Sequence, residues 1–241
     1  MSRINTIIPY LLLLGWPVLT IVYGESLQGQ YRFLRQWSWE NLAWIALAIP
    51  FLLGQERLRL PQGFGRGTSA ARKWLIPAAW GLGFGLLDIV IVRGLLHPEP
   101  YDTLPPYLQP FPYSVLLFPS GALDVEIFYR LIPISVMAWI LLRWGPSTAS
   151  LRVPEQGGSL TTIQWLVIGL TSLREPLEQW PAGPGWFILY SVGSGLAMNA
   201  LQGYCFLRYG FSSALAVRLG HYLAWHILLG IWVQYIEKAP L

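Results

Sequence analysis

The stretch WFILYSVGSGLAMNALQGYCFL, residues 186–207, contains no charged side chain. About 20 consecutive apolar residues are enough for a helix to cross the hydrocarbon core of a bilayer, and a span without charges inserts most readily. We therefore interpret this stretch as a membrane-spanning helix, and it decides the class of fold that the rest of the chain must complete.

The composition of the whole chain has the same character. Of its 241 residues, 54% are hydrophobic and 12% are charged, and the mean hydropathy is +0.46. Soluble domains carry about 25% charged residues and could not hide this much apolar surface. We exclude a soluble enzyme, a disordered chain and a nucleic-acid-binding module. The expected fold is an all-α, polytopic transmembrane helix bundle, a single domain of residues 1–241 with the lipid bilayer as its partner.

Apolar runs elsewhere predict the other helices of this multi-pass protein. The runs cover residues 6–23, 40–54, 74–92, 122–142, 161–173, 186–207 and 211–235. The triplet Pro119-Ser120-Gly121 interrupts a further apolar stretch, so the count is seven helices, or eight if residues 113–120 also span. Residues 97–112 are rich in proline and predict a structured loop.

The distribution of cations between the runs predicts the orientation. With seven spans, nine cations fall on one side, namely Arg3, Arg57, Arg59, Arg66, Arg72, Lys73, Arg143, Arg152 and Arg208. Five fall on the other, namely Arg32, Arg35, Arg93, Arg174 and Lys238. Because cytoplasmic loops carry the excess of Lys and Arg, we expect the amino terminus in the cytoplasm.

Ionisable residues within the predicted spans are the candidate functional residues, because each costs roughly 2.5–3.5 kcal/mol to insert. Glu126 and Arg130 are four residues apart, so they share a helix face and predict a buried ion pair near His221. Asp124 lies about 200° around the helix from Glu126. We expect it to face elsewhere or to cap the helix start.

A second polar set lies in the last span. Arg218, His221 and Tyr222 fall on one helix face, whereas His226 lies roughly 140° from His221 in a regular α-helix. This spacing is unlike a two-histidine metal clamp. Asn199, in the uncharged span, is another polar candidate.

The order of these motifs resembles that of a known family. Glu126 and Arg130 form Glu-x-x-x-Arg, and after a long gap residues 203–221 read GYCFLRYGFSSALAVRLGH. This resembles the CPBP family, the CAAX prenyl protease type II and bacteriocin-processing (Abi) integral membrane proteins. The motifs of that family are Glu-Glu-x-x-x-Arg, Phe-x-x-x-His and His-x-x-x-Asn or Asp. The resemblance covers about residues 113–235.

The resemblance implies an intramembrane endopeptidase that cleaves a membrane-embedded protein substrate. Glu126 matches the second glutamate, Arg130 the arginine and His221 the histidine of the last motif, so these three are the implied catalytic residues. Glu126 would activate water, His221 would stabilise the oxyanion and Arg130 would hold the glutamate. The family has been linked both to zinc, here through His221 and Glu126, and to a metal-free mechanism.

The chain also departs from the family pattern. The departures are Val125 at the first glutamate, Arg174 and Glu175 where the middle histidine should fall, and Trp225 at the Asn or Asp position. Either Glu175, His226 and Asn199 support a rebuilt site around Glu126, or the fold persists without proteolysis.

Three interpretations therefore remain open. The first is a CPBP-type peptidase with an altered site. The second is a non-catalytic scaffold, assembly or immunity subunit of a larger membrane complex. The third is a subunit that binds a pigment or a haem through His221 or His226.

Overall fold

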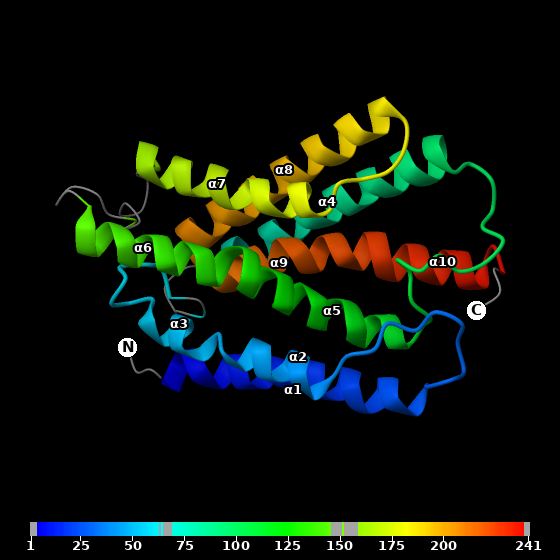
Figure 1. Cartoon of the computed structure of the whole chain (residues 1–241), viewed down its shortest axis with the longest axis horizontal. Coiled ribbons are helices and arrows are strands. Elements are labelled where there is room, and N and C mark those ends of the chain that lie inside the picture. Colours follow the sequence, from blue (N-terminus) through cyan, green and yellow to red (C-terminus); the bar gives the residue numbers. More distant parts are fainter. Residues whose placement is uncertain (1–3, 63, 65–68, 146–150, 152–158, 239–241) are drawn as a thin grey trace.

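The computed structural model describes residues 4–62, 64, 69–145, 151 and 159–238, and within these residues the protein is all-α. Seven helices form one bundle (Figure 1). The predicted fold class is therefore confirmed for the described part of the chain.

Several of the seven helices consist of α-helical segments joined through wider π-helical turns, which are labelled η, or, between α2 and α3, through a two-residue turn. The segments are α1 (Ile4–Ser26), α2 (Trp39–Ala46), α3 (Ile49–Gly54), η1 (Ala71–Leu75), α4 (Ile76–Ile91), η2 (Val92–Leu96), α5 (Tyr113–Glu126), η3 (Ile127–Leu131), α6 (Ile132–Trp144), α7 (Thr162–Glu178), α8 (Gly185–Tyr209), α9 (Phe211–Tyr222), η4 (Leu223–Leu228) and α10 (Leu229–Tyr235).

Four of these helices are long and apolar enough to cross a bilayer, which makes the chain a multi-pass membrane protein. They are Ile7–Ser26, Ala71–Leu96, Tyr113–Trp144 and Phe211–Tyr235. The predicted second span, now α2 and α3, is an apolar helical segment shorter than the ~20 residues that a full crossing needs. The predicted spans 161–173 and 186–207 form the helices α7 and α8, which are not among these four. Large apolar side chains face outward, as Leu12 at 74% and Leu189 at 77% exposure show. Such a surface suits lipid.

Part of the predicted topology lies outside the described residues. Arg3, Arg66 and Arg152 belong to this part, and so does most of the stretch between the predicted spans 122–142 and 161–173. The orientation derived from these cations stays a prediction.

The expected break at residues 119–121 is wrong, because α5 continues through Pro119 into η3 and α6. Pro119 has no N–H to bond the carbonyl of Val115. The indole of Trp16 on α1 donates to that carbonyl at 3.1 Å instead. The hydroxyl of Thr20 donates to the next carbonyl, that of Leu116, at 2.9 Å. A neighbouring helix thus satisfies the backbone that proline frees, as a span in lipid requires.

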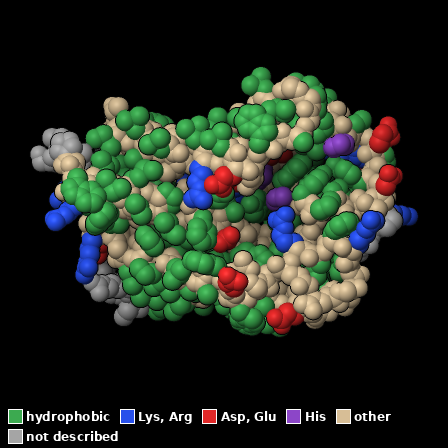
Figure 2. Space-filling view, viewed as in Figure 1, with side chains coloured by type: hydrophobic (Ala, Val, Ile, Leu, Met, Phe, Trp, Pro, Cys, Tyr) green, Lys and Arg blue, Asp and Glu red, His purple; other side chains and the backbone are tan. Residues whose placement is uncertain are grey.

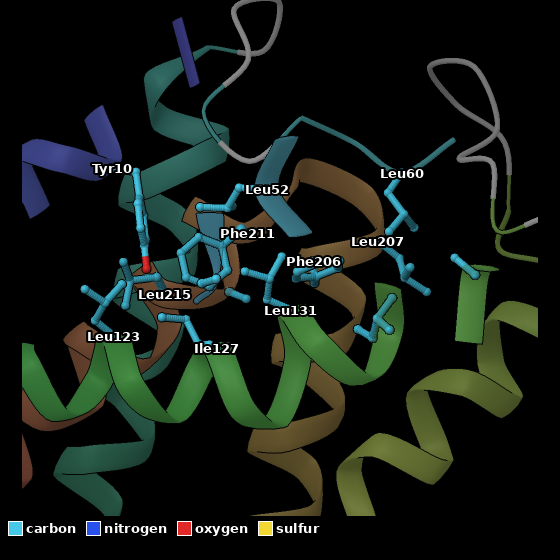
Figure 3. Close-up of a cluster of buried hydrophobic side chains, with 14 of the residues drawn as sticks. Tyr10, Leu52, Leu60, Leu123, Ile127, Leu131, Phe206, Leu207, Phe211 and Leu215 are labelled. Atoms are coloured by element: carbon cyan, nitrogen blue, oxygen red, sulfur yellow. The ribbon is translucent and has the colours of Figure 1, made fainter. Parts of the chain in front are cut away.

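The helices pack in layers. In Figure 1, α1, α2 and α3 run together along one side of the bundle, and α7 and α8 lie on the opposite side. The long helices α5–α6 and α9–α10 cross between them. The apolar core lies where these layers meet, and in Figure 3 Tyr10, Ile127 and Phe211 point toward one another there.

The closest helix contact joins α4 to α9. A Cβ on Gly81 would lie 1.8 Å from the carbonyl oxygen of Val217, and a Cβ on Gly220 would lie 2.0 Å from that of Ala78. Only glycine permits this backbone approach, which is a common way to associate helices in membranes. The contact places Asp88 of α4 beside His221 of α9.

The proline-rich segment between η2 and α5 is an ordered loop without helix, as predicted. Glu237, just beyond α10, anchors it. One carboxylate oxygen accepts from the Arg93 guanidinium at 2.7 Å, and the other accepts from the backbone N–H of Tyr101 at 3.0 Å. Burial alone would raise the pKa of Glu237, but these hydrogen bonds and the charge of Arg93 lower it below its usual value.

We expect Gly81→Ala and Gly220→Ala each to lower the free energy of unfolding by at least ~1–3 kcal/mol, the usual cost of overpacking. The added methyl group meets backbone, which cannot move aside as a flexible side chain can. Thermal unfolding in detergent measures the effect. Gly83→Ala is the matched control on the same helix, because its Cβ would meet nothing within 4 Å. Equal stability of Gly81→Ala and Gly83→Ala would show that the close crossing is wrong.

We expect acid to weaken the loop anchor. Because the pKa of Glu237 is lower in the folded protein than the usual value of about 4.3, its contribution to stability is complete above that value and is lost as the pH falls through the folded pKa. Going from about pH 5 to 3 should lower the melting temperature more for wild type than for Glu237→Gln. The exposed Glu99 lies in the same loop, and Glu99→Gln should behave like wild type.

Candidate functional site

The guanidinium of Arg218 is the centre of a buried polar network. Arg218 lies on α9 and is 1% exposed. Its Nε donates to Glu126 of α5 at 2.9 Å, and its two terminal nitrogens each donate to Glu175 of α7 at 2.6 Å. One of these nitrogens also donates to Gln202 of α8 at 3.1 Å. One cation thus ties four helices together.

Arg130 forms the second half of the network, and it does not make the predicted ion pair. One of its terminal nitrogens, Nη2, donates to the side-chain oxygens of both Asn199 and Gln202, the latter at 2.7 Å. Glu126 is instead bound by Arg218. Arg130 and Glu126 are both fully buried, as expected, but the four-residue spacing selected the wrong cation. The reason is that Arg218 reaches Glu126 from another helix.

The charges of this network balance. Two buried guanidinium groups, Arg130 and Arg218, accompany two buried carboxylates, Glu126 and Glu175. Attraction between them offsets the cost of removing each charge from water. Part of the hydrogen-bonding capacity of the network is unused. Glu126 Oε2, Arg130 Nε and Gln202 Nε2 have no hydrogen-bond partner among the described residues.

The charged end of α7 divides between interior and surface. The helix continues through Pro176 to Glu178, beyond the predicted run. Glu175 points into the network, while Arg174 and Glu178 form an ion pair at 2.7 Å with side chains 50% and 47% exposed. The end of α7 therefore supplies one buried carboxylate to the interior and keeps its other two charges at the surface.

His221 belongs to a separate triad beside the network. Its Nε2 lies 2.7 Å from one carboxylate oxygen of Asp88, and the hydroxyl of Tyr190 donates to the other at 2.6 Å. A carboxylate can only accept, so Nε2 carries the proton. His221 Nδ1 is buried and has no partner among the described residues. The contact of Asp88 with His221 depends on the glycine crossing of α4 and α9.

His226 lies near His221, although five residues separate them in the sequence. It falls in the π-helical turn η4, where hydrogen bonds run from residue i to i+5. The two rings are 6.4 Å apart between centroids. His226 Nδ1 lies 2.9 Å from the carbonyl oxygen of Tyr107 and therefore donates to it. Its ring stacks on Phe118 at 4.1 Å.

The residues implied for zinc do not assemble into a metal site. Glu126 is bound to Arg218 and His221 to Asp88. Among the described residues no group of three or more His, Cys, Asp or Glu side chains is arranged to hold a metal ion. The donor set does not fit zinc, and we derive no step through it. Binding of a pigment or haem by His221 or His226 stays a prediction.

A polar cavity of about 340 Å³ opens beside the network. It is lined by Arg35, Gln36, Trp37, Asn41, Leu117, Phe118, Gly121, Asp124, Val125, Tyr222 and His226. Figure 2 shows the surface hollowed in the region of α5 and α10, where histidine and cationic side chains gather. Asp124 lies near the end of α5 and faces this cavity, so it does not cap the helix start.

The arrangement separates two sets of residues that the sequence had treated as one site. Glu126, Arg130, Glu175 and Asn199 meet in the buried network, and His226 lines the cavity. Sequence reasoning missed Arg218 as the partner of Glu126, because 92 residues separate them and no local spacing signals the contact.

Comparisons with protein families, with curated proteins and with solved structures find no match to this chain. Its function is therefore inferred from its own residues.

We expect Arg218→Met to lower the free energy of unfolding by ~3–5 kcal/mol, because it leaves Glu126 and Glu175 as buried charges without their cation. Denaturation followed by tryptophan fluorescence measures the loss. The triple variant Arg218→Met, Glu126→Gln, Glu175→Gln should recover much of it, since the two carboxylates that lost their cation are then replaced by neutral amides.

The matched control is Arg174→Met, which breaks the exposed, solvent-screened ion pair with Glu178 and should change stability far less than Arg218→Met does. If Arg218→Met were as mild as this control, Arg218 would not hold the bundle together.

Proposed function

We propose that this protein is a non-catalytic relative of the CPBP membrane peptidases and serves as a scaffold or assembly subunit for other membrane proteins. On this proposal the Glu-x-x-x-Arg motif has become a structural network. The positive-inside distribution of loop cations supports an amino terminus in the cytoplasm.

The observation that carries the proposal is the state of Glu126. Its side chain is 0% exposed, and one carboxylate oxygen accepts from Arg218 at 2.9 Å. A general base must reach the water that it deprotonates and must give up a stabilising cation when it accepts the proton. The bound, water-excluded carboxylate of Glu126 suits a structural role better than a catalytic one.

The surroundings of the cavity support the same conclusion. At the position where the family carries its first glutamate, this chain presents the apolar Val125 to the cavity. His221, the matching histidine, is held by Asp88. A hydrolytic site would need a base and an oxyanion donor aimed at one reacting atom. Among the matched residues, Glu126 and His221 each already bind another side chain.

Retained peptide hydrolysis is the competing proposal. It is supported by the presence of Asp124 and His226 in one cavity, where a carboxylate and an imidazole share access to a ligand. In that case Asp124 would replace the missing base, and Glu126 would only hold the helix in place.

We expect purified protein in liposomes to release no more peptide from membrane-anchored or prenylated reporter substrates than Glu126→Gln and Asp124→Asn do. Loss of a general base typically lowers the rate by 10²–10⁴-fold, so an active site would be evident in this comparison. Release is measured by mass spectrometry of the products.

Activity that Asp124→Asn abolishes would establish the cavity as a catalytic site and reject the scaffold. Activity that Glu126→Gln abolishes, in a variant with wild-type helix content, would restore the implied family site. Arg174→Gln, on the exposed surface of α7, is the control that should match wild type in either case.

A further inference from the structure

We propose that the cavity beside α5 binds a small zwitterion carrying a primary ammonium and an oxyanion, the chemistry of a phosphoethanolamine group. The ammonium binds Asp124 and the oxyanion binds Arg35. This inference is independent of the scaffold proposed above, because it concerns residues outside the buried network.

The cavity has the size and composition of a ligand site. Its volume of about 340 Å³ falls within the range of sites for small molecules. The rings of Trp37, Phe118 and Tyr222 provide apolar wall, and a few polar groups converge on the same space. Such a combination of apolar wall and sparse polar groups orients a ligand.

Two opposite charges in this cavity are uncompensated by the protein. Within the described part of the chain, the Asp124 carboxylate and the Arg35 guanidinium make no hydrogen bond and no ion pair. The charges of the buried network, by contrast, are paired, as Arg218 is with Glu126 and Glu175. A carboxylate in a membrane-spanning helix without a partner is costly, and a bound cation would remove that cost.

The difference in burial between Arg35 and Asp124 indicates how the ligand is oriented in the cavity. Arg35 is exposed, in the segment between α1 and α2, whereas Asp124 is half-buried near the end of α5. The lining from Leu117 to Val125 follows α5 for roughly 12 Å at 1.5 Å per residue. A ligand thus enters with its ammonium first and keeps its oxyanion at the mouth. Phosphoethanolamine has this order, because its ammonium is terminal.

The aromatic side chains favour a primary over a quaternary ammonium. A quaternary ammonium needs open ring faces around it. Here His226 stacks on Phe118 at 4.1 Å, and Tyr222 meets Phe118 edge-on at 6.0 Å, so these rings are engaged with one another. Among the described aromatic side chains of the lining, that leaves the ring of Trp37, and one ring does not surround a quaternary ammonium. A primary ammonium instead donates N–H hydrogen bonds, which the Asp124 carboxylate accepts.

The same chemistry can come from a lipid headgroup or from a soluble molecule, and the experiment separates them. Full-length protein is prepared in detergent micelles doped with phosphatidylethanolamine, phosphatidylcholine or phosphatidylglycerol, and bound lipid is counted by native mass spectrometry. Soluble O-phosphoethanolamine is titrated in parallel by calorimetry. We expect phosphatidylethanolamine to bind about tenfold or more tightly than the other two lipids.

Asp124→Asn and Arg35→Gln should each weaken binding of the preferred probe by about tenfold or more. Arg32→Gln and Glu40→Gln are the matched controls, because both residues are exposed nearby and neither lines the cavity. Arg35 lies in an exposed segment, so its variant keeps the test valid if Asp124→Asn folds poorly.

Binding of phosphatidylethanolamine alone would assign a lipid headgroup, and equal binding of O-phosphoethanolamine would assign the soluble group; both outcomes support the site. Lack of binding by every probe would overturn the proposal. So would equal binding of the three lipids, or wild-type affinity in both Asp124→Asn and Arg35→Gln. None of these results bears on peptide release, which tests the scaffold separately.

Discussion

The guanidinium of Arg218 is the interaction on which the interior of this bundle depends. It is 1% exposed and binds carboxylates from α5 and α7 together with an amide from α8. Its positive charge offsets the cost of burying the carboxylates of Glu126 and Glu175 in an apolar surrounding. Helices that share only apolar surface with lipid gain little from burying it against one another. A buried cation with fixed donors therefore specifies which helices pack together and how they are aligned along their axes.

This arrangement has a consequence for chemistry. A network that holds the bundle together by pairing its charges is poorly suited to exchange protons or to admit water, since each change would expose an unpaired charge. Charged groups that a ligand can reach lie outside it, in the cavity lined by Asp124 and Arg35. The structural and the ligand-binding residues are thus distinct, even though Asp124 and Glu126 are only two positions apart.

Local backbone features bring the polar side chains of the interior into contact with one another. Glycines at the crossing of α4 and α9 bring Asp88 to His221, and the wide turn η4 brings His226 within 6.4 Å of the same ring. Pro119 does not break α5, because Trp16 donates to the carbonyl that it frees. The wide turn η4 places His226 where the regular 100° spacing of an α-helix would not, whereas the glycines and Trp16 act through contacts between helices.

The sequence by itself determined that this is an all-α membrane protein, because its apolar runs and scarce charges permit no other way to satisfy the backbone. It also singled out polar residues of the interior, Glu126, Arg130 and Asn199 among them, since any such residue in a span requires a partner. Only the tertiary structure decided the partners. The sequence paired Glu126 with Arg130, four residues away, whereas the fold pairs it with Arg218, 92 residues away. Helical spacing predicts neighbours within one helix, but ion pairs between helices depend on crossings and wide turns that no local pattern encodes.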